Sequence, residues 1–155
     1  MNLIESPVGP LSVETNADGA LTRLVFGALP GAEEDPEALP TLRRQLDQYF
    51  AGERERFELS LALEGSEWER RVWQALQRIP YGETRSYKQI AVECCERTGA
   101  YAARAVGRAN HHNPVPIIVP CHRVIGADGS LVGFGGGLEV KRQLLDLEAG
   151  RLALL

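Results

Sequence analysis

The stretch PCHRV at residues 120–124 follows the apolar run Ile117–Val119 and places Cys121 beside His122 and Arg123. A thiolate attacks far better than a thiol, and neighbouring cations favour the thiolate. Prolines precede the cysteine and glycines follow it, at Pro114, Pro116, Pro120, Gly133, Gly135, Gly136 and Gly137. Stiff backbone before the thiol and Gly-rich backbone after it are typical of a ligand site. We therefore expect a nucleophile at the end of a buried strand, with a buried structural cysteine as the alternative.

Length and charge allow a partner that is a nucleic acid. The 155 residues, 44% of them hydrophobic, suffice for one compact unit or two small ones. The net charge is −4, but residues 1–65 hold 5 Lys and Arg against 12 Asp and Glu, whereas residues 66–124 hold 9 against 5. The basic middle part is the expected DNA-facing surface, and uneven solvated charge is the alternative.

The cysteine pattern favours reduced thiols in the cytoplasm. Cys94 and Cys95 are adjacent, and the third cysteine forms no C-x-x-C pair with either, so we expect neither a disulfide framework nor a four-ligand zinc site. His111 and His112 match no usual metal spacing, so no metal is expected. No window approaches the roughly 18 apolar residues of a membrane span, and the N-terminus shows no targeting pattern.

The first part of the chain predicts a small sheet with one helix. Leu3–Ile4, Leu11–Glu14 and Leu21–Phe26 are expected as strands of an antiparallel meander, because turn residues separate them. Apolar residues then recur at helical spacing, with Thr41 as the expected cap and Gly52 as the stop.

The middle of the chain predicts three helices. Capping boxes at residues 66–69 and 86–89 begin two of them; the first should stop at residues 80–82 and the second near Gly99. An Ala-rich helix over residues 102–109 follows. The last two suggest a helix-turn-helix, although such pairs also occur as plain packing.

Beyond the cysteine, residues 124–132 are expected as a hairpin that turns at residues 128–129. A final helix ends at Glu148, where a carboxylate meets the negative end of the helix dipole. A solvated surface glutamate is one interpretation of that position. The whole predicts an α/β fold of the α+β type. Residues 1–64 are expected to form an antiparallel three-stranded sheet with a helix, and residues 65–155 a mostly helical domain of winged helix-turn-helix type.

Three motifs in order, Ala102–Gly107, Asn113–Ile117 and Pro120–Ile125, resemble those of the O6-alkylguanine-DNA alkyltransferases, which repair DNA by moving an alkyl group to their own cysteine. The resemblance runs from about Trp68 to Glu148. It implies a single-use cysteine S-methyltransferase that needs no cofactor. The implied substrate is double-stranded DNA containing O6-alkylguanine, with O4-alkylthymine left open, and the implied state is a monomer.

The resemblance also assigns roles near the thiol. It implies that Glu148 orients His122, which draws the proton from Cys121 through a water. Tyr87 would assist protonation of the departing base, and Asn113 would tie the helix-turn-helix to the nucleophile.

For the flipped base, the resemblance implies a pocket with Phe134 as its wall and the Gly135 amide and Val124 carbonyl at the guanine edge. Many relatives carry tyrosine where Phe134 stands, so a phenol hydrogen bond is lost here while the stacking face remains.

For the duplex, the resemblance implies that Arg104 fills the vacated stack. The small Ala102 and Ala103 would allow close approach to the minor groove, and Tyr87 and Lys88 would also contact DNA. A phosphate contact is the alternative role for Arg104.

Residues 97–101 lengthen the turn between the two helices relative to the family pattern, and we have no functional account of Cys94 and Cys95. Three other functions remain open: a lesion-binding relative without chemistry, a helix-turn-helix regulator with a structural cysteine, and a cysteine hydrolase. Because Cys121 is present, the first is disfavoured, and no oxyanion site supports the last.

Overall fold

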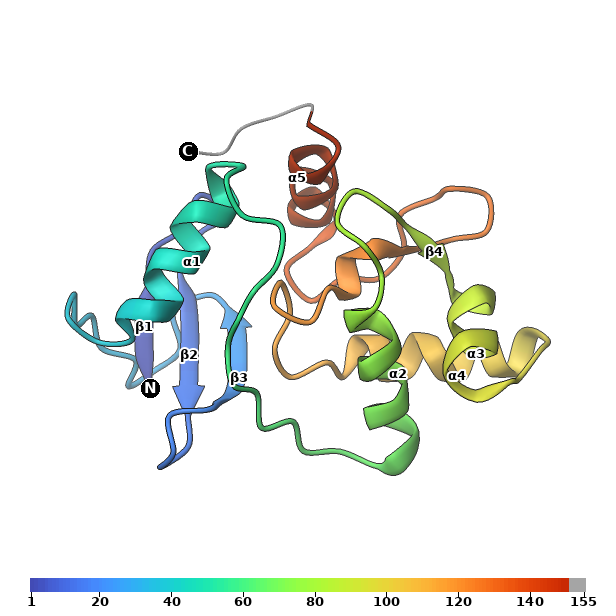
Figure 1. Cartoon of the computed structure of the whole chain (residues 1–155), viewed down its shortest axis with the longest axis horizontal. Helices are drawn as coiled ribbons and strands as arrows, with labels where there is room; N and C mark the ends of the chain where they lie inside the picture. Colours follow the sequence, from blue (N-terminus) through green and yellow to red (C-terminus); the bar gives the residue numbers. More distant parts are fainter. Residues whose placement is uncertain (151–155) are drawn as a thin grey trace.

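The computed structural model describes residues 1–150, so the last five residues of the expected C-terminal domain, 151–155, lie outside it. The elements in chain order are β1 (Asn2–Ile4), β2 (Leu11–Thr15), β3 (Leu21–Phe26), α1 (Pro40–Phe50), α2 (Glu67–Gln77), β4 (Arg85–Ser86), α3 (Tyr87–Cys95), α4 (Ala100–His111), η1 (Cys121–Arg123), β5 (Val124–Ile125) and α5 (Leu138–Glu148). The sheet and α1 lie at one end of the molecule, α2–α4 at the other, and α5 between them (Figure 1). The fold is the expected α+β arrangement.

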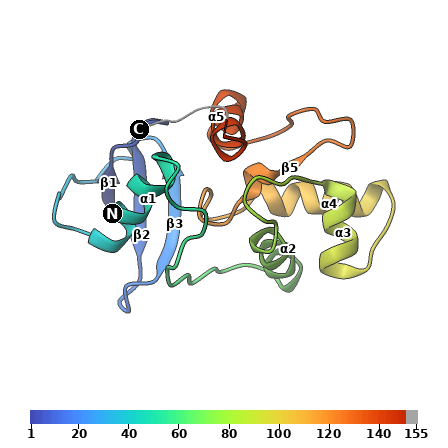
Figure 2. The same ribbon diagram turned by 45° about the horizontal axis from the view of Figure 1, so that its top comes forward.

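The three predicted strands are confirmed as an antiparallel sheet in the order β1-β2-β3. The register pairs Leu3 with Ser12 and Val13 with Leu24. Helix α1 packs along the sheet (Figure 2) and buries five side chains: the polar Gln45 and the hydrophobic Leu42, Leu46, Tyr49 and Phe50.

The expected cap of α1 is wrong. The helix begins at Pro40, with Leu39 as its N-cap in the left-handed region at φ 51°, and not after Thr41. Proline suits the first helical position because its φ is fixed and an N–H there would have no helical partner. The predicted stop is confirmed, since Ala51 caps the helix immediately before Gly52.

Both capping boxes are confirmed. Ser66 Oγ accepts from the N–H of Glu69 at 3.1 Å, and Glu69 Oε1 accepts from the N–H of Ser66 at 3.0 Å. Helix α2 then buries Trp73, whose indole N–H donates to the carbonyl of Ala109 at 2.8 Å. This bond ties α2 to α4.

Helices α3 and α4 form the predicted helix-turn-helix, but α3 ends at Cys95, four residues before Gly99. Glu96 adopts the left-handed conformation at φ 53°, which ends a helix in the way glycine commonly does. Gly99 instead precedes the first residue of α4. The structure also joins Cys94 and Cys95 in a disulfide, so the expectation of reduced thiols is wrong for this pair; adjacency in the chain brings the two sulfurs together.

The segment before Cys121 is a buried turn and not the expected strand. The N–H of Val119 donates to the carbonyl of Val115 at 2.9 Å, and Ile117 has a φ of 74°. Because its prolines have no N–H to donate, this segment cannot sustain a strand ladder. Cys121 consequently opens the short 3₁₀ turn η1.

The expected hairpin over residues 124–132 is also wrong. Strand β5 pairs in parallel with β4, and the turn that follows is closed by the N–H of Gly126 donating to Ser130 at 2.8 Å. No return strand forms, because the carbonyl of Val132 accepts from the ammonium of Lys141 instead of a strand partner.

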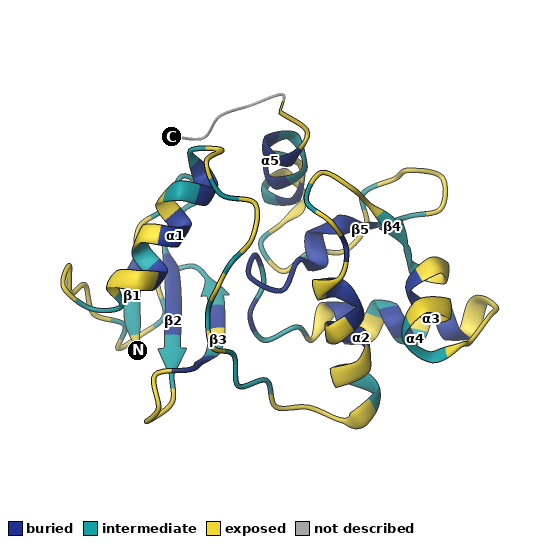
Figure 3. Cartoon of the chain, in the orientation of Figure 1, coloured by how far each residue is buried: buried dark blue, intermediate teal, exposed yellow. Residues whose placement is uncertain are grey.

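One backbone hydrogen bond joins the sheet to the helical part, and another joins it to the segment between α1 and α2. The N–H of Leu24 in β3 donates to the carbonyl of Pro114 at 2.8 Å, and the N–H of Leu21 donates to Ser60 at 2.8 Å. Buried residues lie on both sides of this junction in Figure 3. The division of the chain at residue 64 stays a prediction. None of the helices within residues 1–150 has the length and apolarity to cross a bilayer.

Candidate active site

Cys121 is buried, with 4% of its surface exposed. Its N–H donates to Val119 at 2.8 Å, and its carbonyl accepts from the amide of Asn110 at 3.3 Å. Burial raises the pKa of the Cys121 thiol to about 11, although the amide of Asn113 and the charge of Lys141 lower it in part. The thiol is therefore protonated at neutral pH, and a base must take its proton before it can attack.

His122, the next residue in the chain, has the protonation state that a general base needs. It is fully buried, and its Nε2 lies 2.6 Å from Oε2 of Glu148. Burial lowers the pKa of His122 in spite of the carboxylate, so the ring is neutral at neutral pH. The carboxylate holds the single ring proton on Nε2, which leaves Nδ1 unprotonated. Nδ1 is buried and has no hydrogen-bond partner within residues 1–150. It is therefore free to receive the thiol proton.

Glu148 is the last residue of α5 and accepts four hydrogen bonds. Arg123 donates from Nε to Oε1 at 2.7 Å and from NH2 to Oε2 at 3.1 Å, and Tyr49 donates to Oε2 at 2.6 Å, in addition to His122. Burial alone would raise the pKa of Glu148, but its interactions with His122 and Arg123 lower it to about 2. With 6% of its surface exposed, Glu148 is not the solvated surface carboxylate of the alternative interpretation. These donors also offset its unfavourable place at the helix C-terminus.

Asn113 closes the turn that leads to the nucleophile. Its Nδ2 donates to the carbonyl of Val119 at 2.9 Å, and its Oδ1 accepts from the N–H of Val115 at 3.0 Å. The side chain thus connects the end of α4 to the residues before Cys121, as the sequence led us to expect.

Lys141 is a site residue that the sequence analysis missed. Its side chain is fully buried, and Nζ donates to the carbonyls of Val124 at 2.7 Å and Val132 at 2.9 Å. Burial lowers the pKa of Lys141, while Cys121 raises it. The ammonium thus bonds both ends of the loop at residues 124–132. One of these bonds goes to the Val124 carbonyl, which was expected to bond the guanine edge. The signal was its spacing, seven residues before Glu148 and so on the same helix face.

The expected pocket residues lie on this loop and on α3. The phenol of Tyr87 donates to Val132 at 3.3 Å. Burial and then the nearby charge of Cys121 raise the pKa of Tyr87, so the phenol is protonated near the thiol. The ring of Phe134 lies 5.4 Å from that of Phe26 in β3, so the sheet contacts the expected pocket wall. Gly135 is exposed, and a Cβ there would meet nothing within 4 Å.

The expected DNA-facing residues do not all reach the surface. Arg104 on α4 and Lys88 on α3 are exposed, and Ala103 is half-buried. Ala102 is only 6% exposed, so its side chain packs into the core and offers little contact surface.

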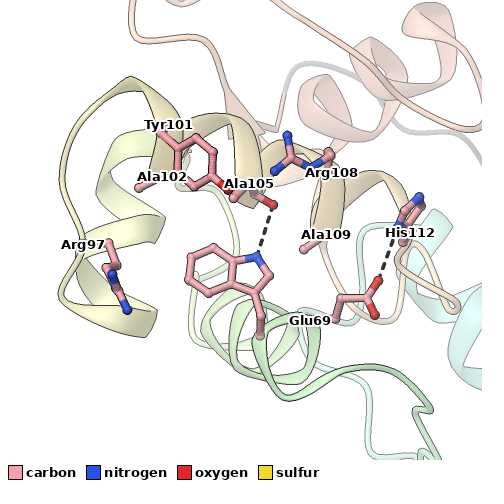
Figure 4. Close-up of a pocket in the computed structure, with 9 residues that line it drawn as sticks. Glu69, Arg97, Tyr101, Ala102, Ala105, Arg108, Ala109 and His112 are labelled. Carbon is pink, nitrogen blue, oxygen red and sulfur yellow. Dashed lines mark hydrogen bonds and ion pairs between the residues drawn. The ribbon is translucent and has the colours of Figure 1, made fainter.

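A cavity of about 470 Å³ lies on the flank of α4 (Figure 4). The indole of Trp68 donates to the carbonyl of Ala105 at 3.2 Å, and Tyr101 is 74% exposed at the first turn of α4. The cavity is lined by Trp68, Glu69, Arg97, Tyr101, Ala102, Ala105, Arg108, Ala109 and His112. Arg97, between α3 and α4, and Tyr101, in the first turn of α4, thus place a cation and an aromatic ring in this cavity on the helix that carries Arg104.

Metal ligands do not gather within residues 1–150, where no three His, Cys, Asp or Glu side chains form a group that could hold an ion. Nδ1 of His112 instead lies 3.2 Å from Oε2 of Glu69.

Comparisons with known proteins show which protein family the chain belongs to. The sequence profile described as "6-O-methylguanine DNA methyltransferase, DNA binding domain" matches residues 67–150, and that of the "ribonuclease-like domain" of the same name matches residues 1–63. The chain therefore belongs to the 6-O-methylguanine DNA methyltransferase family.

Individual relatives agree over nearly the full chain. A methylated-DNA–protein-cysteine methyltransferase of Mycolicibacterium paratuberculosis is 52% identical over 94% of this chain and 89% of its own. One of Methanosarcina barkeri is 46% identical over 97% and 98%. The structure of Mycobacterium tuberculosis OGT in complex with DNA matches with a TM-score of 0.86 and 49% identity, covering 97% of this chain and 92% of that one.

Proposed function

We propose that this protein repairs DNA by moving an alkyl group, typically methyl, from O6 of guanine to the sulfur of Cys121. The observation that carries the proposal is the buried Glu148–His122 pair, 2.6 Å apart, next to a protonated and buried thiol. Family membership supports the same chemistry, because its relatives are named for transfer to a protein cysteine.

The reaction exchanges one bond and one proton. The thiol proton passes through a water to Nδ1 of His122, and the resulting imidazolium is stabilised by Glu148. The thiolate attacks the alkyl carbon in line with O6, so that the S–C bond forms as the C–O bond breaks. Guanine leaves and needs a proton on N1, which the phenol of Tyr87 supplies. The Tyr87 phenolate then regains a proton from water, and the His122 imidazolium releases one to water, so one proton leaves the thiol and one reaches guanine.

The product makes the protein a single-use reagent. An S-alkyl thioether is a poor leaving group, unlike the thioester of an acyl-enzyme, and the mechanism provides no group that removes the alkyl from sulfur. We expect one alkyl group per protein, transferred by a monomer in the cytoplasm.

DNA presents its target atom inside the duplex, so the nucleotide must be flipped out. The exposed Arg104 on α4 is suited to fill the vacated stack. Phe134 would form the pocket wall, and Gly135 has the open space that a base edge needs. Two further exposed cations, Arg97 and Arg108, add positive charge that can bind the phosphate backbone.

The test is to incubate the protein with a duplex carrying O6-methylguanine and to measure the mass of the intact protein. We expect one methyl group on the peptide that contains Cys121, and none in Cys121→Ser. Binding of lesion DNA without a mass change would favour a lesion-binding relative, binding of plain DNA alone would favour a regulator, and product formation beyond one equivalent would favour a turnover hydrolase. Each of these outcomes overturns the proposal.

A further inference from the structure

Tyr49 joins the N-terminal sheet-plus-helix part to the site. It lies on α1, is fully buried, and its phenol oxygen is 2.6 Å from Oε2 of Glu148, 99 residues later in the chain. Its ring packs against Phe50, Phe57 and Tyr81, with centroid distances of 5.3, 5.2 and 6.4 Å. The phenol is therefore buried, and three neighbouring rings and the bond to Glu148 hold it in place.

The same oxygen of Glu148 serves the base. Oε2 accepts from Tyr49 and from Nε2 of His122 at 2.6 Å each, whereas Oε1 accepts from Arg123. Burial and then the Glu148 carboxylate raise the pKa of Tyr49 well above its ordinary value, so the phenol stays protonated and acts as a donor. The phenol and the imidazole thus share one carboxylate oxygen.

We propose that Tyr49 is a positioning residue for alkyl transfer, which fixes Oε2 of Glu148 against His122 and limits the negative charge that the imidazole senses. The inference rests on the proposed function, since it concerns the base of that reaction. It assigns the N-terminal part of the chain a direct share in the site.

Two effects follow from the shared oxygen. A second donor on Oε2 disperses its charge, so removal of the phenol should strengthen the pull of Glu148 on the imidazole proton and raise the pKa of His122. The carboxylate also loses the contact from α1 that fixes its plane, which should loosen the ring of His122. The higher pKa of His122 should change the midpoint of the acid limb in the pH profile of transfer. The looser ring should change the rate of transfer on the alkaline plateau.

Other charged groups face the pair and must stay constant in the test. Arg123 and Cys121 face it from η1, Lys141 from α5, and Tyr81, itself near Glu55, from the segment after α2. The experiment therefore changes one oxygen atom only, in Tyr49→Phe.

The assay uses free O6-benzylguanine, which needs neither DNA binding nor flipping, in single-turnover reactions across the acid limb of the pH profile. We expect Tyr49→Phe to transfer about tenfold more slowly on the alkaline plateau, less than the roughly 10²–10⁴ of losing the base itself. The midpoint of the acid limb should rise. The Nε2 proton of His122, followed by NMR, should shift in the same variant without any transfer.

Leu42→Ala is the matched control, because Leu42 is a buried apolar residue two turns earlier on the same helix and has no polar side-chain atom that could contact Glu148. It should lower the melting temperature and leave the midpoint unchanged. A double variant adds a second readout: in a Glu148→Gln background, Tyr49→Phe should have little further effect on the rate.

The outcomes separate the inference from the proposed function. If the wild-type protein transfers no alkyl group, the proposed function fails. If it transfers, and Tyr49→Phe keeps the wild-type rate, midpoint and His122 resonance, the inference is wrong and Tyr49 is a packing residue. An equal loss of rate from Tyr49→Phe with and without Glu148 would overturn it as well.

Discussion

Lys141 and Glu148 lie seven residues apart on α5, and both side chains are buried against the segment that contains Cys121. Lys141 reaches the carbonyl of Val124, whereas Glu148 reaches His122. One helix thus sets a positive charge near the proposed nucleophile, Cys121, and a negative charge at the proposed base, His122. Because the two positions share a face of a rigid helix, their separation is fixed by helix geometry and needs no adjustment on binding.

Loss of the Glu148 charge should slow transfer. Glu148→Gln removes the carboxylate that holds the proton of His122 on Nε2 and stabilises the imidazolium, so we expect a rate lower by about 10²–10⁴. Single-turnover transfer from free O6-benzylguanine measures it. Glu139→Gln, exposed in the first turn of α5, is the matched control. Rapid transfer by Glu148→Gln would show that the pair is structural only.

The raised pKa of Cys121 predicts a loss of stability at alkaline pH. Its value rises from 9.0 to about 11, so the folded state holds the proton that the unfolded state releases. A thiol pKa that is higher in the folded state stabilises the fold fully at pH values below the pKa of the unfolded state. This stabilisation is lost as the pH rises toward and through the pKa of the folded state. The free energy of unfolding should fall by about 1.4 kcal/mol per pH unit across this window.

Melting temperatures of the wild-type protein and Cys121→Ser, compared between about pH 8 and 10.5, isolate this effect, because tyrosine phenols titrate in both proteins. The wild type should lose stability more steeply. If the melting temperatures of the two proteins fall equally with pH, the Cys121 thiol is accessible to water and its pKa is not raised.

Removal of the Lys141 charge should make the thiol less acidic. Lys141→Met keeps a long side chain but deletes the ammonium that favours the thiolate and removes one hydrogen bond from each of two carbonyls, of which Val132 keeps the bond from Tyr87. Alkylation of Cys121 by iodoacetamide, located by peptide mass, should shift to higher pH. Arg142→Met, its exposed neighbour, should not shift it. An unchanged profile would confine Lys141 to a purely structural part in the loop.

Arg104→Ala should separate base flipping from chemistry. If Arg104 fills the vacated stack, the variant should lose far more rate on a duplex than on free O6-benzylguanine, and a mismatched partner should restore part of the loss. A lost phosphate contact would instead weaken all DNA alike and lower the salt slope by about one. Arg44→Ala, exposed on α1, controls for charge. Equal losses on duplex and free base would exclude the stacking role.

Local signals predicted the elements and part of the site. Capping boxes at Ser66 and Ser86 begin α2 and α3 as expected, because the donors they satisfy lie within one helical turn. The neighbours Cys121 and His122 and the family motifs placed the reacting groups. Two boundaries were wrong because another residue nearby sets them. Helix α1 begins at Pro40 and not after a cap at Thr41, and Glu96 ends α3 before Gly99.

What the sequence by itself determined is the set of elements whose partners lie close in the chain, together with the choice of Cys121 and His122 as the proposed nucleophile and base. Only the tertiary structure decided how they are held. Tyr49 meets Glu148 across 99 residues, and Lys141 takes the Val132 carbonyl that a hairpin would have paired. The spacing of Lys141 and Glu148 places them on one helix face, but it does not reveal their partners, since these depend on how α1 and α5 pack on the rest of the fold. Burial then sets the protonation of Cys121, His122 and Glu148, because desolvation and neighbouring charges exist only once the chain is folded.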